Sequence, residues 1–159
     1  MKSLFITLVS MTITASADAT SVVRADKSFE QIITSADHVV VGKVIGVSMR
    51  DKKGKKVQDP KAHTGPHSGN VISIRVTVEE GGILKTHAKD FPRAVSYVLW
   101  PSLILDLAAM KELEGQSFII LLDGDHFQPH GVAPFDFMWP LDWRERVVSV
   151  IAAEKKRQN

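Results

Sequence analysis

The chain has 159 residues, of which 24% are charged and 44% are hydrophobic, and its formal net charge is +2. This balance is ordinary for a globular protein, and the length suits one domain with a sizeable core rather than two. So small a net charge argues neither for nucleic acid nor for an acidic substrate. Because the sequence contains no cysteine, disulfides, thiolate metal sites and a thiol nucleophile are excluded.

The first 19 residues have the pattern of a secretory signal peptide. Lys2 precedes an apolar stretch over residues 4–13, and Ala15, Ala17 and Ala19 fit the small-residue pattern of a cleavage site. This apolar stretch is far shorter than the roughly 20 residues that a membrane-spanning helix needs. We therefore expect removal of residues 1–19, a single mature domain over residues 20–159 without a transmembrane anchor, and a periplasmic or secreted location.

A long strand over residues 38–49 is the central element of the predicted fold. Its residues are apolar on both faces, which is typical of a central strand, and Gly42 and Gly46 allow it to bend as strands do at the corners of small barrels. A short helix is expected just before it, because Ser28 and Gln31 have the spacing of a capping box.

Residues 50–70 are predicted to form a mobile basic loop between two strong strands. This segment contains six lysines and arginines but only two aspartates, which gives it a net charge of +4. Glycines and prolines are frequent in it and apolar residues are scarce, as in long surface loops.

Four further strands are predicted over residues 71–79, 94–100, 118–122 and 126–128. In the first of these, Ile72, Ile74, Val76 and Val78 alternate with polar residues and are expected to face the core. A helix over residues 103–114 is expected between the third and fourth strands, with Ile104 on its buried side. The sequence thus predicts a mainly β protein: a five-stranded OB-like (oligonucleotide/oligosaccharide-binding) barrel with a short N-terminal helix, this inserted helix and a C-terminal helix.

The aromatic residues near the C-terminus are predicted to be structural. Phe135, Phe137 and Trp139 alternate along the chain, and Trp143 begins a helical stripe that continues through Val147 and Ile151. We expect them to fill one end of the barrel and to pack under the C-terminal helix, although a ligand-stacking platform is the alternative.

Three segments together resemble the core pattern of OB-like domains. They are SADHVVVGKV at residues 35–44, IRVTVE at residues 74–79 leading to Leu84 and Lys85, and GQSFIILL at residues 115–122. The resemblance covers about residues 29–127. Among OB-like domains, the chain resembles the branch of the tissue inhibitors of metalloproteinases and netrin modules. Small exported bacterial proteins show similar patterns. Those inhibitors use an N-terminal cysteine to coordinate the metal of their target, and this chain has none. The resemblance therefore implies a fold and no functional residue.

Two histidine pairs are the candidate metal ligands. His63 and His67 form one pair, and His126 and His130, which follow Asp123 and Asp125, form the other. Residues four apart on an extended strand are about 13 Å apart, so only a turn would bring either pair onto one ion. The sequence-based hypothesis is a divalent metal at His126 and His130, and the alternative is exposed loop histidines without a cofactor.

No recognised catalytic motif occurs, since a nucleophile elbow, a zinc-protease helix and a phosphate-binding loop are all missing from the sequence. We therefore expect an exported, non-enzymatic binding module for a protein or another envelope component. The alternative is a divalent-metal-binding protein or metal-dependent hydrolase that uses the His126/His130 loop. Nucleic acid is not expected as a partner, because the basic loop lacks the interleaved aromatics that stack on bases.

Overall fold

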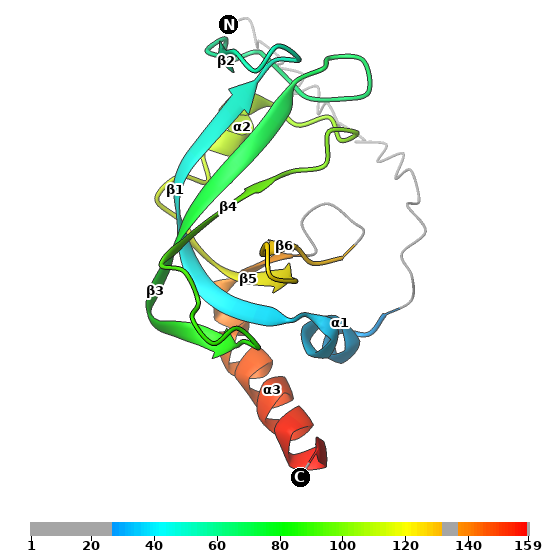
Figure 1. Ribbon diagram of the computed structural model, residues 1–159, viewed down its shortest axis with the longest axis vertical. Coiled ribbons are helices and arrows are strands. Elements are labelled where there is room, and N and C mark those ends of the chain that lie inside the picture. Colours follow the sequence, from blue (N-terminus) through cyan, green and yellow to red (C-terminus); the bar gives the residue numbers. More distant parts are fainter. Residues whose placement is uncertain (1–26, 132–136, 159) are drawn as a thin grey trace, which may run out of the picture.

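A strongly curved antiparallel sheet forms the body of the protein, with helices packed at one end of it (Figure 1). This computed structural model describes residues 27–131 and 137–158, so the predicted signal peptide and Phe135 lie outside the described residues. The strands are β1 (His38–Arg50), β2 (Lys56–Val57), β3 (Val71–Lys85), β4 (Ala94–Val98), β5 (Ser117–Asp123), β6 (Gln128–Pro129) and β7 (Met138–Pro140). The helices are α1 (Phe29–Ser35), α2 (Leu107–Lys111), the 3-10 turn η1 (Leu141–Trp143) and α3 (Arg144–Gln158).

The sheet is not closed, so the predicted five-stranded barrel is wrong in closure and in strand number. The described residues form seven strands, with the order β4-β3-β1-β5-β6 along the main path, while β2 pairs with β1 and β7 with β5. The end strands β4 and β6 come within 8 Å of each other, Cα to Cα, but do not pair. One physical reason is that β6 contains only two residues, and one of them, Pro129, has no N–H to donate.

Strand β1 pairs with β3 on one side and with β5 on the other, and its register shifts three times against β3. One shift lies between Val44 and Gly46, and it reverses the inward and outward alternation. Val44 is consequently buried, whereas Ile45 is 49% exposed. The alternation along β1 therefore shifts at this bulge, with Ile45 facing outward and Val47 facing inward.

Strand β3 continues to Lys85, past the expected strand end at residue 79. Val40 is opposite Ile83 and Gly42 is opposite Val78, so three residues of β1 span six residues of β3. The extra residues bulge out of the ladder, and Gly81 adopts a φ of 66° there. The predicted inward face is confirmed: Ile72, Ile74 and Val76 are fully buried, with Val78 packed partly against the core.

The second half of the basic loop is anchored to the rest of the fold. Thr64 is 1% exposed, its Oγ1 donates to the Leu103 carbonyl at 2.5 Å, and its N–H donates to the Leu105 carbonyl at 3.0 Å. The first half folds into a tight hairpin in which β2 pairs with the end of β1.

The helix predicted over residues 103–114 is much shorter than expected. Only Leu107–Lys111 is α-helical, and Ile104 is 75% exposed rather than buried. The reason is that Leu103 and Leu105 use their carbonyls to bind Thr64 in an extended arrangement, which prevents a helical ladder from starting there.

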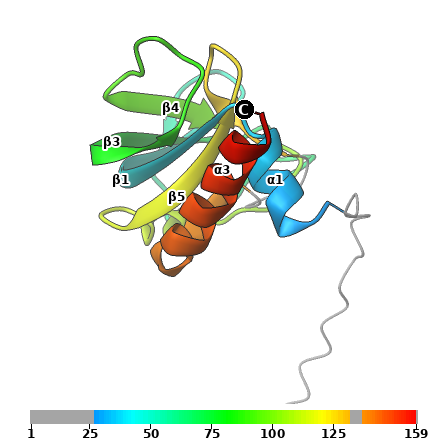
Figure 2. The same ribbon diagram turned by 90° about the horizontal axis from the view of Figure 1, so that it is seen from below.

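Helices α1 and α3 lie side by side (Figure 2), at the lower end of the sheet as drawn in Figure 1. The capping box at the start of α1 is confirmed, since Gln31 N–H binds the Ser28 hydroxyl and the Gln31 side chain binds the Ser28 N–H. Val147 and Ile151 of α3 are buried as predicted. The aromatic residues near the C-terminus lie in two different places. Phe137 is fully buried in the curved sheet, while Trp139 and Trp143 pack against the Phe29 ring of α1.

Candidate functional site

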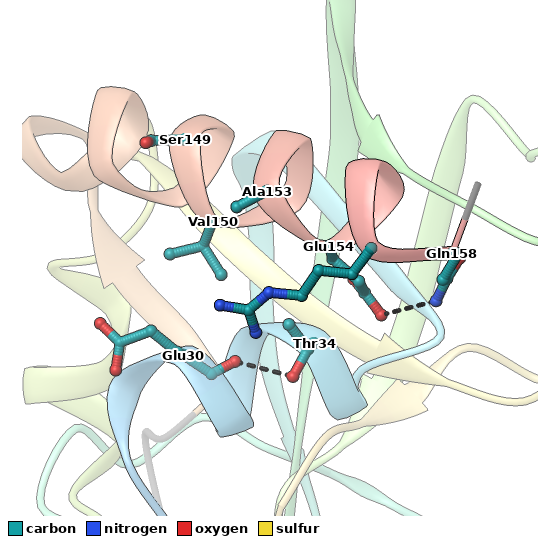
Figure 3. Close-up of a pocket in the computed structure, with 8 residues that line it drawn as sticks. Glu30, Thr34, Ser149, Val150, Ala153, Glu154 and Gln158 are labelled. Carbon is teal, nitrogen blue, oxygen red and sulfur yellow. Dashed lines mark hydrogen bonds between the residues drawn. The ribbon is translucent and has the colours of Figure 1, made fainter.

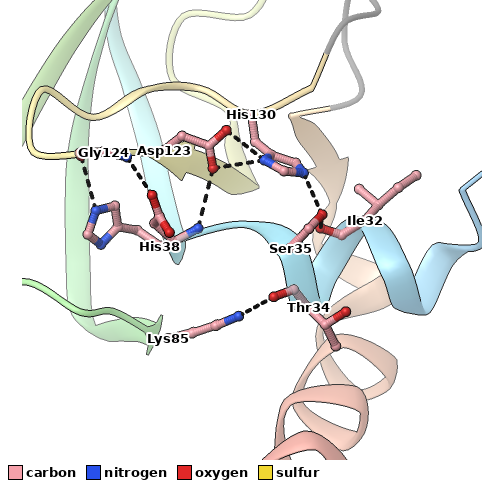
Figure 4. Close-up of polar contacts among 9 residues, drawn as sticks. Ile32, Thr34, Ser35, His38, Lys85, Asp123, Gly124 and His130 are labelled. Carbon is pink, nitrogen blue, oxygen red and sulfur yellow. Dashed lines mark hydrogen bonds and ion pairs between the residues drawn. The ribbon is translucent and has the colours of Figure 1, made fainter. Parts of the chain in front are cut away.

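A polar cluster lies where the end of α1 meets the β5–β6 hairpin (Figure 4). Ser35 is the last residue of α1, Asp123 is the last residue of β5, and His130 directly follows β6. The hairpin turns back at residues 124–127, and the His130 N–H then donates to the Leu121 carbonyl at 3.0 Å. This backbone pairing places the imidazole between the serine and the aspartate.

The three side chains form one chain of hydrogen bonds. His130 Nδ1 lies 2.8 Å from both carboxylate oxygens of Asp123, and His130 Nε2 lies 3.1 Å from Ser35 Oγ. His130 is 6% exposed, whereas Ser35 is exposed at the surface and the Asp123 side chain is 40% exposed. The serine residue at one end is thus exposed, while the histidine is buried.

Asp37 holds the carboxylate end of this cluster in place. The Asp37 N–H donates to Asp123 Oδ1 at 3.3 Å, and the Gly124 N–H donates to Asp37 Oδ2 at 2.8 Å. The two aspartates therefore cross-link the start of β1 to the end of β5 through backbone groups. Such bonds fix the orientation of the Asp123 carboxylate toward His130.

The cluster satisfies its hydrogen bonds in two protonation states of His130. An ionised Asp123 only accepts, so the proton on Nδ1 points to it in both states. In the neutral imidazole, Nε2 accepts from the Ser35 hydroxyl. In the imidazolium, Nε2 donates to Ser35 Oγ, and the hydroxyl proton turns to the Ile32 carbonyl, which lies 3.2 Å away. Ser35 and His130 therefore stay hydrogen-bonded to each other in both protonation states of the imidazole.

His38 has a structural role. Its ring is 3% exposed and contacts the rings of Phe91 and Phe127, at centroid distances of 5.5 and 5.0 Å. Its Nδ1 is hydrogen-bonded to Thr86 Oγ1 and its Nε2 to the Gly124 carbonyl. Both ring nitrogens are used within the fold.

The two histidines predicted as metal ligands have different surroundings. His126 is exposed in the β5–β6 turn, while His130 is buried and paired with Asp123. Across residues 27–131 and 137–158, no group of three or more His, Asp or Glu side chains is arranged to hold a metal ion. His63 and His67 are exposed in the loop at the far end of β1. The divalent-metal hypothesis for His126 and His130 stays a prediction.

A second candidate surface, the basic tip, lies at the other end of β1. We define it by six exposed side chains: Arg50, Lys52, Lys53, Lys55, Lys56 and Lys61. The two carboxylates of this segment serve its backbone, because Asp51 Oδ1 accepts from the N–H groups of Lys53 and Lys55, and Asp59 Oδ1 accepts from that of Lys61. Within the described part of the chain, none of the six cations forms an ion pair.

A pocket of about 420 Å³ lies between α1 and α3 (Figure 3). Glu30 and Glu154 line it, and each binds a cation: Glu30 lies 3.4 Å from Arg146, and Glu154 lies 3.3 Å from Lys85. Hydrogen bonds from its own backbone N–H and from Ser28 hold the pKa of Glu30 below its ordinary value. Glu30 thus links α1 to α3, and Glu154 links α3 to β3.

No protein-family model and no curated protein matches this sequence. The class of this protein is therefore given by its fold alone. It is a mainly β protein with a curled antiparallel sheet and flanking helices. Sequence reasoning identifies His130 and the basic residues but not Ser35, which it places only in the segment 35–44 that resembles OB-like domains. No local motif marks this serine, since its partners are 88 and 95 positions further along the chain.

Proposed function

We propose that this chain is an exported binding module that attaches to a phosphate-bearing anionic component of the cell envelope through the basic tip. The observation that carries the proposal is the arrangement of the six exposed cations on one structured segment. Their two neighbouring aspartates are bound to backbone N–H groups rather than to the lysines. The tip therefore presents its positive charge to the solvent.

The strength of such a surface follows from simple electrostatics. Each lysine or arginine near an anionic membrane surface contributes about 1 kcal/mol, and the attraction falls off within a Debye length of about 10 Å in 0.1 M salt. The tip carries no exposed large apolar side chain among its described residues that would insert into lipid. We therefore expect reversible, salt-sensitive binding rather than insertion.

Export is part of this proposal, and it rests on the sequence. Residues 1–19 have the order of charge, apolar stretch and small residues that signal peptides share. In the described residues, the structure contains no helix with the length and apolar character needed to cross a membrane. Binding to an envelope component would then hold an exported protein at its site of action.

We also propose that the curled sheet is an opened relative of the OB-like barrels of the metalloproteinase-inhibitor and netrin type. Supporting this are the antiparallel order of β3, β1 and β5, the strong curvature of β1 and the near approach of β4 and β6. The basic tip corresponds to a loop between the first two long strands of such a sheet. Loops of this kind are common ligand-binding positions in OB-like folds.

The test is co-sedimentation of the purified protein with vesicles of phosphatidylglycerol and phosphatidylcholine, compared with phosphatidylcholine alone. We expect binding only to the anionic vesicles and its loss as salt rises. The triple variant K52Q/K53Q/K55Q should bind at least tenfold more weakly. The matched control K155Q/K156Q/R157Q, at the exposed end of α3, removes the same charge and should bind nearly as well as the unmodified protein. Equal losses in both variants would refute the basic tip as the binding surface.

A further inference from the structure

We propose that Ser35, His130 and Asp123 form a hydrolytic triad that cleaves carboxylic esters. Ser35 is the nucleophile, His130 is the general base and acid, and Asp123 positions the imidazole. This activity goes beyond the binding function proposed above and would replace the non-enzymatic expectation from the sequence. The triad lies at the start of β1 and the basic tip at its end, so the two functions can be tested separately.

The distances are those that the chemistry requires. A nucleophile and its base must lie within about 2.6–3.2 Å of each other, with a third group orienting the base. Ser35 Oγ lies 3.1 Å from His130 Nε2, and His130 Nδ1 lies 2.8 Å from the Asp123 carboxylate. The order of atoms along this chain is that of a serine hydrolase, with Nδ1 facing the acid and Nε2 facing the hydroxyl (Figure 4).

Burial divides the roles between the three residues. Ser35 is exposed, so the carbonyl carbon of an ester can approach its hydroxyl. His130 is 6% exposed, and its two ring nitrogens are hydrogen-bonded to Asp123 and Ser35. The Asp123 carboxylate is held by the Asp37 N–H and binds His130 through both oxygens, so the imidazole is fixed in the tautomer that accepts a proton at Nε2.

The triad lies at the C-terminal end of α1, where the free backbone groups of a helix are carbonyls and not N–H groups. The same carbonyls give no help to an oxyanion. We therefore expect covalent labelling of Ser35 and slow turnover of activated esters, rather than fast hydrolysis of unactivated ones.

The proposed reaction is balanced with water as the only co-reactant. Ser35 Oγ attacks the ester carbonyl carbon and its proton moves to His130 Nε2. The bond to the alcohol oxygen then breaks, and the departing alkoxide takes the proton from Nε2. Water attacks the resulting acyl-serine with His130 as base, which releases the carboxylic acid and restores the Ser35 hydroxyl.

The first test is the reaction of the purified protein with an alkyl fluorophosphonate, with the labelled residue identified by mass spectrometry. The hydrolysis of p-nitrophenyl acetate by the unlabelled protein is measured in parallel. General-base assistance is typically worth 10²–10⁴-fold, so we expect H130Q to slow labelling of Ser35 at least 100-fold. D123N should also slow it, and S35A should abolish it. The control S149A, which removes an exposed hydroxyl on α3, should change nothing. No adduct at Ser35, or an equal rate in H130Q, would overturn the triad.

A second measurement needs no change at His130. Because the chain contains no cysteine, the variants S35C and S149C each carry a single thiol. If His130 acts as a base toward position 35, S35C should react with iodoacetamide at pH 7 at least tenfold faster than S149C. Equal rates in the two folded variants would show that the hydrogen bonds to His130 are structural only.

Discussion

The guanidinium carbon of Arg146 lies 4.1 Å from the centroid of the Phe29 ring, so helix α3 packs directly against helix α1. Phe29 also contacts Trp139 and Trp143, at centroid distances of 5.1 and 5.3 Å. These contacts join the first and last helices of the described chain into one unit. The triad proposed above depends on this unit, because Ser35 is the last residue of α1.

The first prediction concerns Trp143, which joins α3 to α1. Replacing Trp143 with alanine should lower the free energy of unfolding by about 2–4 kcal/mol, because the substitution removes contacts with Phe29 and Trp139 and leaves a cavity. Urea unfolding gives this value directly. The control V148A, at a 43% exposed position of the same helix, should change stability by less than about 0.5 kcal/mol. Equal stabilities of the two variants would show that α3 does not dock through Trp143.

A second prediction separates the two glycines of β1. A Cβ at Gly42 would overlap with Val76 Cγ1 and come within 3.3 Å of the Thr77 carbonyl, whereas a Cβ at Gly46 would meet no atom within 4 Å. Gly42→Ala should therefore destabilise the protein by about 1–3 kcal/mol, as overpacking does. Gly46→Ala should be neutral or slightly stabilising. Thermal unfolding of both variants measures the difference, and a Gly42→Ala variant as stable as Gly46→Ala would contradict the packing of β1 against β3.

Local patterns in the sequence predicted the elements that depend on local interactions. The capping box of Ser28 and Gln31 fixed the start of α1, and the alternation of Ile72, Ile74 and Val76 fixed the inward face of β3. In both cases the residues that decide the structure lie within a few positions of one another. Such signals are readable from a single chain.

Long-range contacts explain the parts that the sequence did not predict. The exposure of Ile45 follows from the register shift of β1 against β3, and the shortening of α2 follows from the binding of Leu103 and Leu105 by Thr64. The candidate triad has the same character, because Ser35 meets His130 only after the β5–β6 hairpin has folded. No periodicity or spacing within one segment contains this information.

A third prediction tests the anchor of the basic loop. Thr64→Val keeps the shape of the side chain but removes the hydroxyl that donates to the Leu103 carbonyl and accepts from the Leu105 N–H. Leaving buried groups unpaired costs about 1–3 kcal/mol, so the variant should lose stability in that range. The control is Thr77→Val, at a half-buried position on the outer side of β3, which should be nearly neutral. If Thr64→Val is also neutral, residues 62–65 are not part of the folded core.

The last prediction uses Tyr97, the one tyrosine in the sequence. Its ring is 2% exposed and packs edge-on against Phe137, and burial raises the pKa of its phenol above the ordinary value of about 10. The unfolded chain therefore loses this proton first as the pH rises. The stability contribution of the neutral phenol is complete below pH 10 and declines progressively above it, which destabilises the folded state by linkage. We expect tyrosinate absorbance at alkaline pH to appear together with unfolding, and Tyr97→Phe to unfold at higher pH than the unmodified protein. Ionisation of Tyr97 near pH 10 in the folded protein would mean that its phenol is not buried in the core beside Phe137.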